Sequence, residues 1–372
     1  MKTPNGHEVI QLFEQLAPKQ LAMEGDKIGL QVGTLNKPIR KVMIALDVLE
    51  EVVDEAIEEK VDLIIAHHPP IFRPLSKIVV DQPAGRIIEK LIKHDITVYA
   101  AHTNLDVAIG GVNDLLAQQL QLQNVEGLVP TYEEPLKKLV VFVPKEDANK
   151  VRQALGDAGA GAIGNYSHCS FSTGGEGRFL PGEGTKPHIG KQGQLETVQE
   201  ERIETIYPVS LEKKVLSAML KAHPYEEVAY DIYPLDMKGA TYSLGRIGEL
   251  KKEMTLREFA EFVKTVFDVP QVRVVGNLEA NVKKVAVIGG DGNKYYSHAV
   301  FKGADVYVTG DMYYHTAHDA LMAGLNIVDP GHNVEKVMKQ GVAQWLTEQT
   351  SSKKWDLDIL PSKINTDPFQ FV

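Results

Sequence analysis

The sequence predicts an α/β protein made of two related α/β lobes with an α+β domain inserted between them. Three observations lead to this fold class. Both ends of the chain alternate short apolar strands with helices, which is typical of parallel sheets with crossover helices. The middle of the chain has the order β-α-β-β-α-β of a ferredoxin-like module. Strands in both end regions are followed by Gly, Asp or His. We place the lobes at 1–127 and 238–372 and the insert at 128–237.

Length and composition narrow the classes of protein to which the chain can belong. Its 372 residues suit two or three domains, and a charged fraction of 24% is ordinary for a globular protein. The net charge of −10 argues against a broad nucleic-acid surface, although a local basic groove stays open. The single cysteine, Cys169, excludes an intramolecular disulfide and indicates a reducing compartment. No apolar run has the length of a signal peptide or a membrane span, so we expect a cytoplasmic protein without membrane contact.

The N-terminal lobe is predicted to contain three buried strands and four helices. The first helix, over 3–16, has apolar side chains at helical spacing and begins with Thr3 as its cap and Pro4 in its first turn. A glycine-punctuated segment follows it. The last helix is expected to be capped by Asn113. The predicted strands are 41–47 and the apolar starts of 61–70 and 96–106, and the remaining helices are 50–59, 85–94 and 113–121.

The insert and the C-terminal lobe differ in their order of elements. The insert has predicted strands at 136–143, 165–173, 199–207 and 228–233, with helices at 147–158 and 211–222. Its glycine-rich segment 174–193 is predicted as a long exposed loop. The C-terminal lobe alternates again, with strands at 282–288, 305–309 and 326–329 and helices at 256–267, 295–302, 316–323 and 333–349. Ligands of such sheets bind beyond the carboxyl ends of the strands, which directs attention to the residues there.

Histidines and acids follow the predicted strands of the N-terminal lobe. His67 and His68 end the strand in VDLIIAHHPP, His102 and Asp106 follow the strand in ITVYAAHTNLD, and Asp47 ends KVMIALD. Successive strand residues point to opposite faces, so one of the adjacent histidines can face the core and the other a cleft. An ordinary structural role fits each group equally well. The histidines can be hydrogen-bonded residues at a strand end, and Asp106 can belong to an Asx turn that caps the next element.

A third group, at a strand-to-helix junction far downstream, favours a metal site. His332 and Glu335 are three residues apart and can face outward from one helical turn. The alternative is that Glu335 only complements the helix dipole, which predicts no histidine partner. Three histidines and two carboxylates suit two metal ions bridged by a carboxylate oxygen, and without a thiolate they leave Zn²⁺, Mn²⁺, Fe²⁺, Co²⁺ and Ni²⁺ open. The set is His67, His68, Asp106, His332 and Glu335.

Other polar residues near the predicted site are assigned supporting roles. His102 is expected to orient a ligand, to act as a further ligand or to shuttle protons. Asp311 and His315, in the segment GDMYYHTAHDA, are weaker candidates, and His315 is expected to reach the site as a second proton carrier. No residue is assigned to direct catalysis.

Six motifs, spread over nearly the whole chain, resemble those of one known family. They are IIAHHPPIF, AAHTNLD, HPYEEVAYDIYPL, YSLGRIGEL, GADVYVTGDMYYHTAHDA and DPGHNVEK. In combination they resemble the YqfO-type, Nif-three-like proteins, which are named GTP cyclohydrolase 1 type 2 homologues. The family's usual Trp-Asp-Asn segment is changed here to Gly25-Asp26-Lys27.

The resemblance implies two related α/β lobes that flank a dinuclear metal site. Two divalent ions per subunit are then expected, with Zn²⁺ favoured over Fe²⁺, Mn²⁺, Co²⁺ or Ni²⁺. The implied ligands are the same five residues, His67, His68, Asp106, His332 and Glu335. The resemblance also implies that the insert is similar to the trimeric PII and CutA proteins, and that the chain forms a toroidal homohexamer whose insert caps the ring or guards its cavity.

These expectations lead to one principal function and two alternatives. The principal function is a metal-dependent hydrolase that activates water between two divalent ions, for which GTP ring opening, phosphoester hydrolysis and amide hydrolysis fit equally well. The first alternative is a non-enzymatic regulatory or metal-handling hexamer, whose PII-like insert binds a small effector or a partner. The second is nucleic-acid threading through the ring, which the acidic charge of the chain makes less fitting.

Overall fold

The protein has a mixed α/β fold with two sheets, and its computed structural model describes residues 2–372. Two compact units make up the chain. The larger unit combines the segment up to Tyr132 with Tyr242–Val372, and the smaller unit is Glu133–Thr241. Two long strands, β5 (Gln123–Pro144) and β8 (Tyr230–Thr255), have residues in both units. Among residues 2–372, no helix combines the length and the apolar character needed to cross a lipid bilayer.

One sheet of the larger unit has five strands in the order β1-β4-β3-β2-β13. Strands β13, β2, β3 and β4 are parallel, and β1 runs antiparallel to β4. Ala66 pairs with both Ala45 and Ala100, so three strands end at the same level and the residues after them meet at one edge. The strand bounds are β1 (Gly29–Val32), β2 (Lys41–Ala45), β3 (Leu63–Ala66), β4 (Thr97–Ala100) and β13 (Asp358–Pro361).

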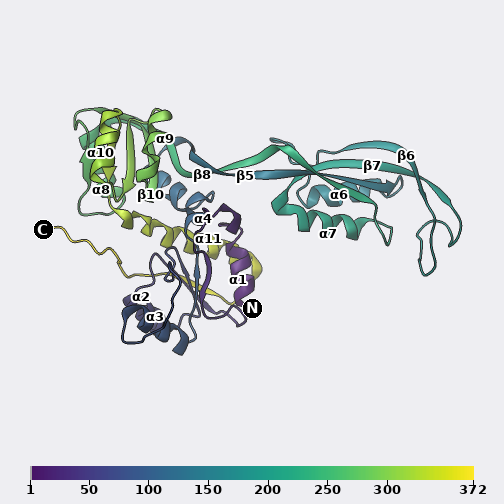
Figure 1. Cartoon of the computed structure of the whole chain (residues 1–372), viewed down its shortest axis with the longest axis horizontal. Helices are drawn as coiled ribbons and strands as arrows, with labels where there is room; N and C mark the ends of the chain where they lie inside the picture. The colour runs from purple at the N-terminus through teal and green to yellow at the C-terminus, as the bar shows by residue number, and fades with distance from the viewer. Residues whose placement is uncertain (1) are drawn as a thin grey trace. The chain divides into compact units, whose positions relative to one another are not determined.

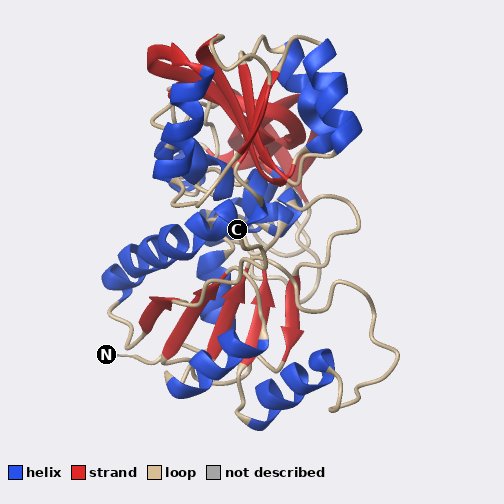
Figure 2. Cartoon of the chain, turned by 90° about the vertical axis from the view of Figure 1, so that its left-hand side faces the viewer, coloured by secondary structure: helices blue, strands red, loops and turns tan. Residues whose placement is uncertain are grey.

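Helices cover both faces of this sheet (Figure 2). Successive side chains of β2 point to opposite faces of the sheet, which explains the two helix layers. Val42 and Ile44 pack in the core cluster of α1 and α11, whereas Met43 and Ala45 pack in that of α2 and α3. The helices of this part are α1 (Gly6–Phe13), α2 (Glu50–Glu58), α3 (Pro83–Lys93), α4 (Thr103–Val107), α5 (Val112–Gln119) and α11 (Val337–Lys353), with a 3₁₀ turn η1 (Lys19–Leu21).

Two predicted helix caps are wrong. Helix α1 begins at Gly6, and its cap is Asn5 instead of Thr3. The Asn5 side chain accepts a hydrogen bond from the Glu8 amide, and the Glu8 carboxylate accepts one from the Asn5 amide, which is a capping box. At α5 the cap position is Gly111, so Asn113 lies inside the first turn, where it is fully buried.

The second sheet has eight strands, and β5 and β8 extend from the larger unit into the smaller one. In the larger unit, β8 is followed across the sheet by β10, β11, β12 and β9. Strands β10, β11 and β12 are parallel, and β8 and β9 flank them in antiparallel orientation. The predicted helix over 333–349 is divided into a 3₁₀ segment, η4, and the longer α11. The bounds are β9 (Arg273–Val275), β10 (Asn281–Asp291), β11 (Val306–Gly310), β12 (Asn326–Asp329), α8 (Leu256–Val266), η3 (Asn293–Tyr295), α9 (Tyr296–Phe301), α10 (Tyr314–Met322) and η4 (His332–Lys336).

The smaller unit has the element order β5-α6-β6-β7-α7-β8, with the strands arranged as β6-β7-β5-β8. Helices α6 and α7 lie on the same face of the strands (Figure 1). Val141 and Val143 of β5 and Ile203 of β7 share a core cluster with Val151 of α6 and Met219 of α7. The remaining bounds are α6 (Ala148–Asp157), β6 (Phe171–Phe179), β7 (Glu196–Pro208), η2 (Val209–Leu211) and α7 (Glu212–Ala222).

The path of the chain around β6 differs from the prediction. The strand expected at 165–173 begins at Phe171 and continues to Phe179, so the first six residues of the predicted loop 174–193 are in a strand. Backbone pairing with β7 runs from Phe171 opposite Glu204 to Phe179 opposite Glu196. These main-chain hydrogen bonds hold a glycine-rich stretch in a strand although glycine has a low β-propensity.

We expect His223 to make the stability of the protein depend on pH. Its Nε2 lies 2.9 Å from the carbonyl oxygen of Phe142, and its Nδ1 accepts a hydrogen bond from the Tyr225 amide at 3.1 Å. This pattern requires the neutral imidazole, and burial lowers the pKa of His223 from its usual 6.5.

The direction of this pH dependence follows from proton linkage. Below about pH 6.5 the unfolded chain binds a proton that the folded chain rejects, so stability is lost as the pH falls through that range. In thermal unfolding, Tm should fall more between about pH 7.5 and about pH 5.5 in the wild type than in His223→Gln, which cannot titrate. An equal fall in both proteins would show that His223 does not contribute.

Candidate metal centre

The carboxyl ends of both sheets bring polar residues together in the larger unit. His67 and His68 directly follow β3, and His102 lies just after β4. From the second sheet, His332 and Glu335 lie in η4, shortly after β12. Asp106, in α4, completes the set of residues with inward-facing ligand atoms.

One carboxylate oxygen lies at the centre of the cluster. Glu335 Oε2 is 3.1 Å from His68 Nε2, 3.1 Å from His332 Nε2 and 3.7 Å from His67 Nε2. Asp106 Oδ1 lies on the other side of His67, 3.5 Å from its Nε2. Three groups therefore have ligand atoms within 4.8 Å of one another: His67 with Asp106 and Glu335, His68 with His332 and Glu335, and His67 with His68 and His102.

Each histidine is oriented by an acceptor at its outer nitrogen, Nδ1. For three of them the acceptor is a carboxylate: Asp47 at 2.7 Å from His68, Asp311 at 2.6 Å from His332, and Asp26 at 2.9 Å from His102. His67 donates from Nδ1 to the carbonyl oxygen of Ala101 at 2.9 Å. An imidazole held in this way presents Nε2 as its free ligand atom, which is the arrangement that metal-binding histidines adopt.

Two buried atoms of the cluster lack a partner within the protein. His67 Nε2 and Asp106 Oδ1 make no hydrogen bond in the described part of the chain, although their residues are buried. Buried polar atoms are nearly always paired, because leaving one unpaired costs the full desolvation of the group. A bound cation would satisfy both atoms, so the donor set fits a metal ion by its chemistry.

The charges of the cluster are strongly coupled. Burial alone would raise the pKa of Glu335, but the hydrogen bond with His332 and the nearby charge of His67 hold it well below its usual value. Burial raises the pKa of Asp106 to about 6. For His68, hydrogen bonds to Asp47 and Glu335 outweigh burial and raise the pKa to about 10. Positive charge is thus favoured around Glu335, as a cation site requires.

A glycine makes room for the cluster at the end of β10. Gly290 has a φ of +61°, which an L side chain rarely adopts. A Cβ atom at this position would lie 2.7 Å from Glu335 Oε1 and 3.1 Å from His332 Nε2. The backbone of β10 can therefore approach the central carboxylate only because residue 290 has no side chain.

Asn113 joins the two halves of the site. Its Nδ2 donates to the carbonyl oxygen of Asp106 at 3.0 Å, and its Oδ1 accepts from the Gly289 amide at 3.0 Å. The buried amide therefore ties helix α4, which carries Asp106, to the end of β10, next to Gly290. The predicted role of Asn113 as a helix cap is replaced by this bridge.

The C-terminal segment also reaches the site. The Thr366 hydroxyl donates to Asp47 Oδ2, and the other oxygen of Asp47 bonds His68. Two further hydrogen bonds fix the position of this segment: the Ser362 hydroxyl donates to Glu55, and the Ile364 carbonyl oxygen accepts from Lys339. A residue near the end of the chain thereby helps to orient a candidate ligand.

We expect Thr366→Val to weaken metal binding by about 3- to 10-fold, less than the usual loss for a residue that bonds a ligand directly. Valine keeps the shape of threonine but leaves one Asp47 oxygen without its hydrogen bond. Competition with a chromophoric chelator measures the affinity, and Thr366→Ser, which keeps the hydroxyl, should bind like the wild type. Wild-type affinity in Thr366→Val would mean that Asp47 needs no support from the C-terminal segment.

The structure separates the predicted site residues into two sets. His67, His68, Asp106, His332 and Glu335 lie together, and His102 joins them, with ring centroids 5.3 Å from His67 and 5.7 Å from His68. In the part of the chain that the structure describes, His315 belongs to none of the three groups. Its ring lies 5.3 Å from that of Tyr314 on α10.

Several supporting residues could not be assigned from the sequence. Asp26 bonds His102 and both the amide and the hydroxyl of Thr103, although it lies in a segment for which no role was predicted. Its retention within Gly25-Asp26-Lys27, where two other family residues are replaced, is the one available signal. Thr366 carries no motif, so no local pattern points to it.

Comparisons with known proteins agree over the whole chain. The model of the family Duf34/NIF3 (NGG1p interacting factor 3) matches residues 4–368. A protein of Bacillus subtilis (strain 168) named GTP cyclohydrolase 1 type 2 homolog is 64% identical over 371 residues, which cover 100% of both chains. The crystal structure of a Bacillus cereus protein related to NIF3 is similar, with a TM-score of 0.95, 66% identity and full coverage of both chains. Staphylococcus aureus protein SA1388 is similar at a TM-score of 0.79 and 33% identity, again over both full chains. The chain therefore belongs to the Duf34/NIF3 family.

Proposed function

We propose that the cluster binds two divalent metal ions on either side of Glu335. His67 and Asp106 would hold one ion, His68 and His332 would hold the other, and Glu335 would be shared. The observation that carries the proposal is the orientation of the histidines, whose Nε2 atoms surround a buried carboxylate while acceptors hold every Nδ1. The ligand atoms are nitrogen and oxygen without sulfur. We favour Zn²⁺ for such a set, which Fe²⁺, Mn²⁺, Co²⁺ and Ni²⁺ also bind.

We further propose that the site hydrolyses a small molecule. When bound, the two ions would supply Lewis acidity and make water nucleophilic near neutral pH. The residues of the chain would position the ions and transfer protons. His102 lies beside His67 and His68, and Asp26 holds its Nδ1, so its Nε2 is the proton acceptor we favour. The name shared by the relatives, GTP cyclohydrolase 1 type 2 homolog, makes GTP the first substrate to assay.

The assay compares the metal-loaded protein with matched variants. We expect release of product from GTP, or from another nucleotide in a panel, which is lost in His332→Ala and His68→Ala. His318→Ala, a change on α10 outside the three groups, serves as the control. Activity that survives both ligand variants would exclude this site as the catalyst.

The alternative is a regulatory or metal-handling protein. For it we propose that the smaller unit is a PII- or CutA-like module and binds an effector within a homohexamer. The β-α-β-β-α-β order of the smaller unit supports this alternative. It predicts metal binding without turnover, and a mass in solution of six chains. Absence of turnover across the nucleotide panel, together with stoichiometric metal, would favour it over the hydrolase.

A further inference from the structure

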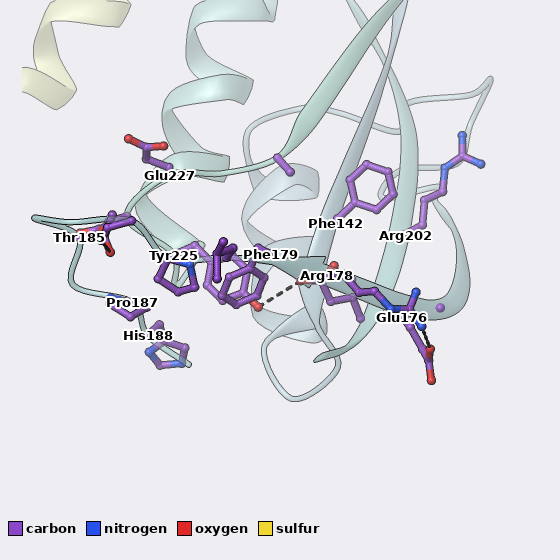
Figure 3. Close-up of a pocket in the computed structure, with 18 of the residues that line it drawn as sticks. Phe142, Glu176, Arg178, Phe179, Thr185, Pro187, His188, Arg202, Tyr225 and Glu227 are labelled. Carbon is purple, nitrogen blue, oxygen red and sulfur yellow. Dashed lines mark hydrogen bonds and ion pairs between the residues drawn. The ribbon is translucent and has the colours of Figure 1, made fainter. Parts of the chain in front are cut away.

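The smaller unit contains a cavity of about 730 Å³, which is separate from the metal centre of the larger unit. This volume is in the range of pockets that hold small organic ligands. The cavity is bounded by β6, by the loop that follows it as far as His188, by two residues of β7 and by the segment before β8. Phe142 of β5 also lines it (Figure 3).

The cavity has space above β6 because three of the lining residues of this strand, Gly174, Gly175 and Gly177, have no side chain. Gly175 lies opposite Glu200 of β7, and Thr173 lies opposite Arg202, so these four residues share the sheet face away from α6 and α7. A Cβ atom on Gly175 would meet nothing within 4 Å, and its backbone needs no left-handed φ. Neither the conformation nor the packing of the chain requires glycine at 175, and a side chain there would extend into the cavity.

The walls are aromatic. The ring of Tyr225 lies 5.7 Å from that of Phe179 and 6.3 Å from that of His188, and both of these residues also line the cavity. Its hydroxyl donates to Glu200 Oε1 at 3.1 Å, which fixes the ring in place. Figure 3 shows the ring of Phe142 set apart from the Phe179–Tyr225 pair. Aromatic walls of this kind suit a planar ring, which can stack against them.

The charges around the cavity disfavour an anion. Both arginines already have carboxylate partners: Arg178 lies 2.6 Å from Glu176, and Arg202 lies 3.0 Å from Glu204 outside the lining. The carboxylates that line the cavity outnumber the arginines, four to two, and they are Glu176, Glu200, Glu226 and Glu227. A phosphate group would therefore meet net negative charge without an uncommitted arginine.

We infer that this cavity binds a small heteroaromatic molecule without phosphate, of the size and chemistry of a nucleoside. Its ring would pack against the rings of Phe179 and Tyr225, and its polar edge would face Glu200. The inference is independent of hydrolysis at the metal centre, because the two sites lie in different units.

Calorimetric titration of the full-length, metal-free protein with adenosine, guanosine, cytidine and their triphosphates tests the inference, because removal of metal disables the proposed nucleotide site at the metal centre. We expect saturable binding of at least one nucleoside at one site per chain, with the corresponding triphosphate bound at least about tenfold more weakly. Saturable binding of none of them, or equal affinity for the triphosphate, would overturn the inference.

A graded series of variants locates the binding. Gly175→Ala should weaken nucleoside affinity, and Gly175→Val should weaken it by more than about tenfold, because the added methyl groups occupy the space of the ring. Neither should lower Tm, since strands tolerate these residues better than glycine. Thr197→Val on β7, outside the cavity lining, and Glu335→Ala at the metal centre should bind like the wild type. Full affinity in Gly175→Val, with Tm unchanged, would place any binding elsewhere and contradict the inference.

Discussion

Glu335→Ala is expected to abolish binding of both proposed metal ions. The central oxygen, Oε2, lies 3.1 Å from Nε2 of both His68 and His332, and 3.7 Å from that of His67. Each proposed ion would therefore lose a ligand, and the remaining imidazoles would face one another without the shared negative charge. The loss should exceed the about 10- to 100-fold that removal of an outer partner of a metal ligand typically costs.

Metal content after dialysis, measured by mass spectrometry of the digested protein, checks this expectation. Glu348→Ala, an exposed change on α11, is the matched control and should keep the wild-type content. Circular dichroism establishes that both variants are folded. Wild-type metal content in Glu335→Ala would show that the carboxylate is not a shared ligand, and the dinuclear proposal would fail.

Asn113→Asp is expected to lower the free energy of unfolding by about 2 to 4 kcal/mol, because it removes a buried donor and adds a buried charge. The amide nitrogen of Asn113 donates to the Asp106 carbonyl, and an aspartate would place a second acceptor against that carbonyl. The Gly289 amide could still donate to residue 113. Helix α4 and the end of β10 would separate, so metal affinity should fall together with stability.

This substitution distinguishes a bridge from a helix cap. Aspartate is as good a cap as asparagine, so a capping role predicts little change. Chemical denaturation of the metal-free protein gives the free energy of unfolding, and Asn149→Asp, an exposed change in α6, serves as the control. Stability within about 0.5 kcal/mol of the wild type in Asn113→Asp would restore the capping interpretation.

Much of the fold could be predicted because its signals are local. Apolar runs in the sequence predict the strands β2, β3 and β12 directly. The polar residues after these runs mark the sheet edge at which the ligands of parallel sheets bind. The clustering of His67 and His68 with His332 was predictable from residue type and from position at strand ends. No single segment established it, because each histidine group alone also fits an ordinary structural role.

The remaining features depend on contacts between distant parts of the chain. Strand β13 joins the first sheet beside β2, although it lies more than three hundred residues later, and neither its four residues nor those of β1 were recognised. Asn113 has the sequence context of a cap, yet the approach of Gly289 decides its role. Strand β6 was predicted in part as loop, because pairing with β7 rather than side-chain pattern holds its glycines. The support that Asp26 and Thr366 give to histidines likewise has no local signature.

Anomalous X-ray diffraction from crystals of the metal-loaded protein, collected on both sides of the absorption edge of the metal, tests the proposed centre most directly. We predict two anomalous peaks per chain, one beside His67 and Asp106 and one beside His68 and His332, with the carboxylate of Glu335 between them. A single peak, or two peaks without Glu335 as a shared ligand, would contradict the dinuclear centre. Peaks elsewhere, with none at these residues, would remove the metal site and the hydrolase proposal that depends on it.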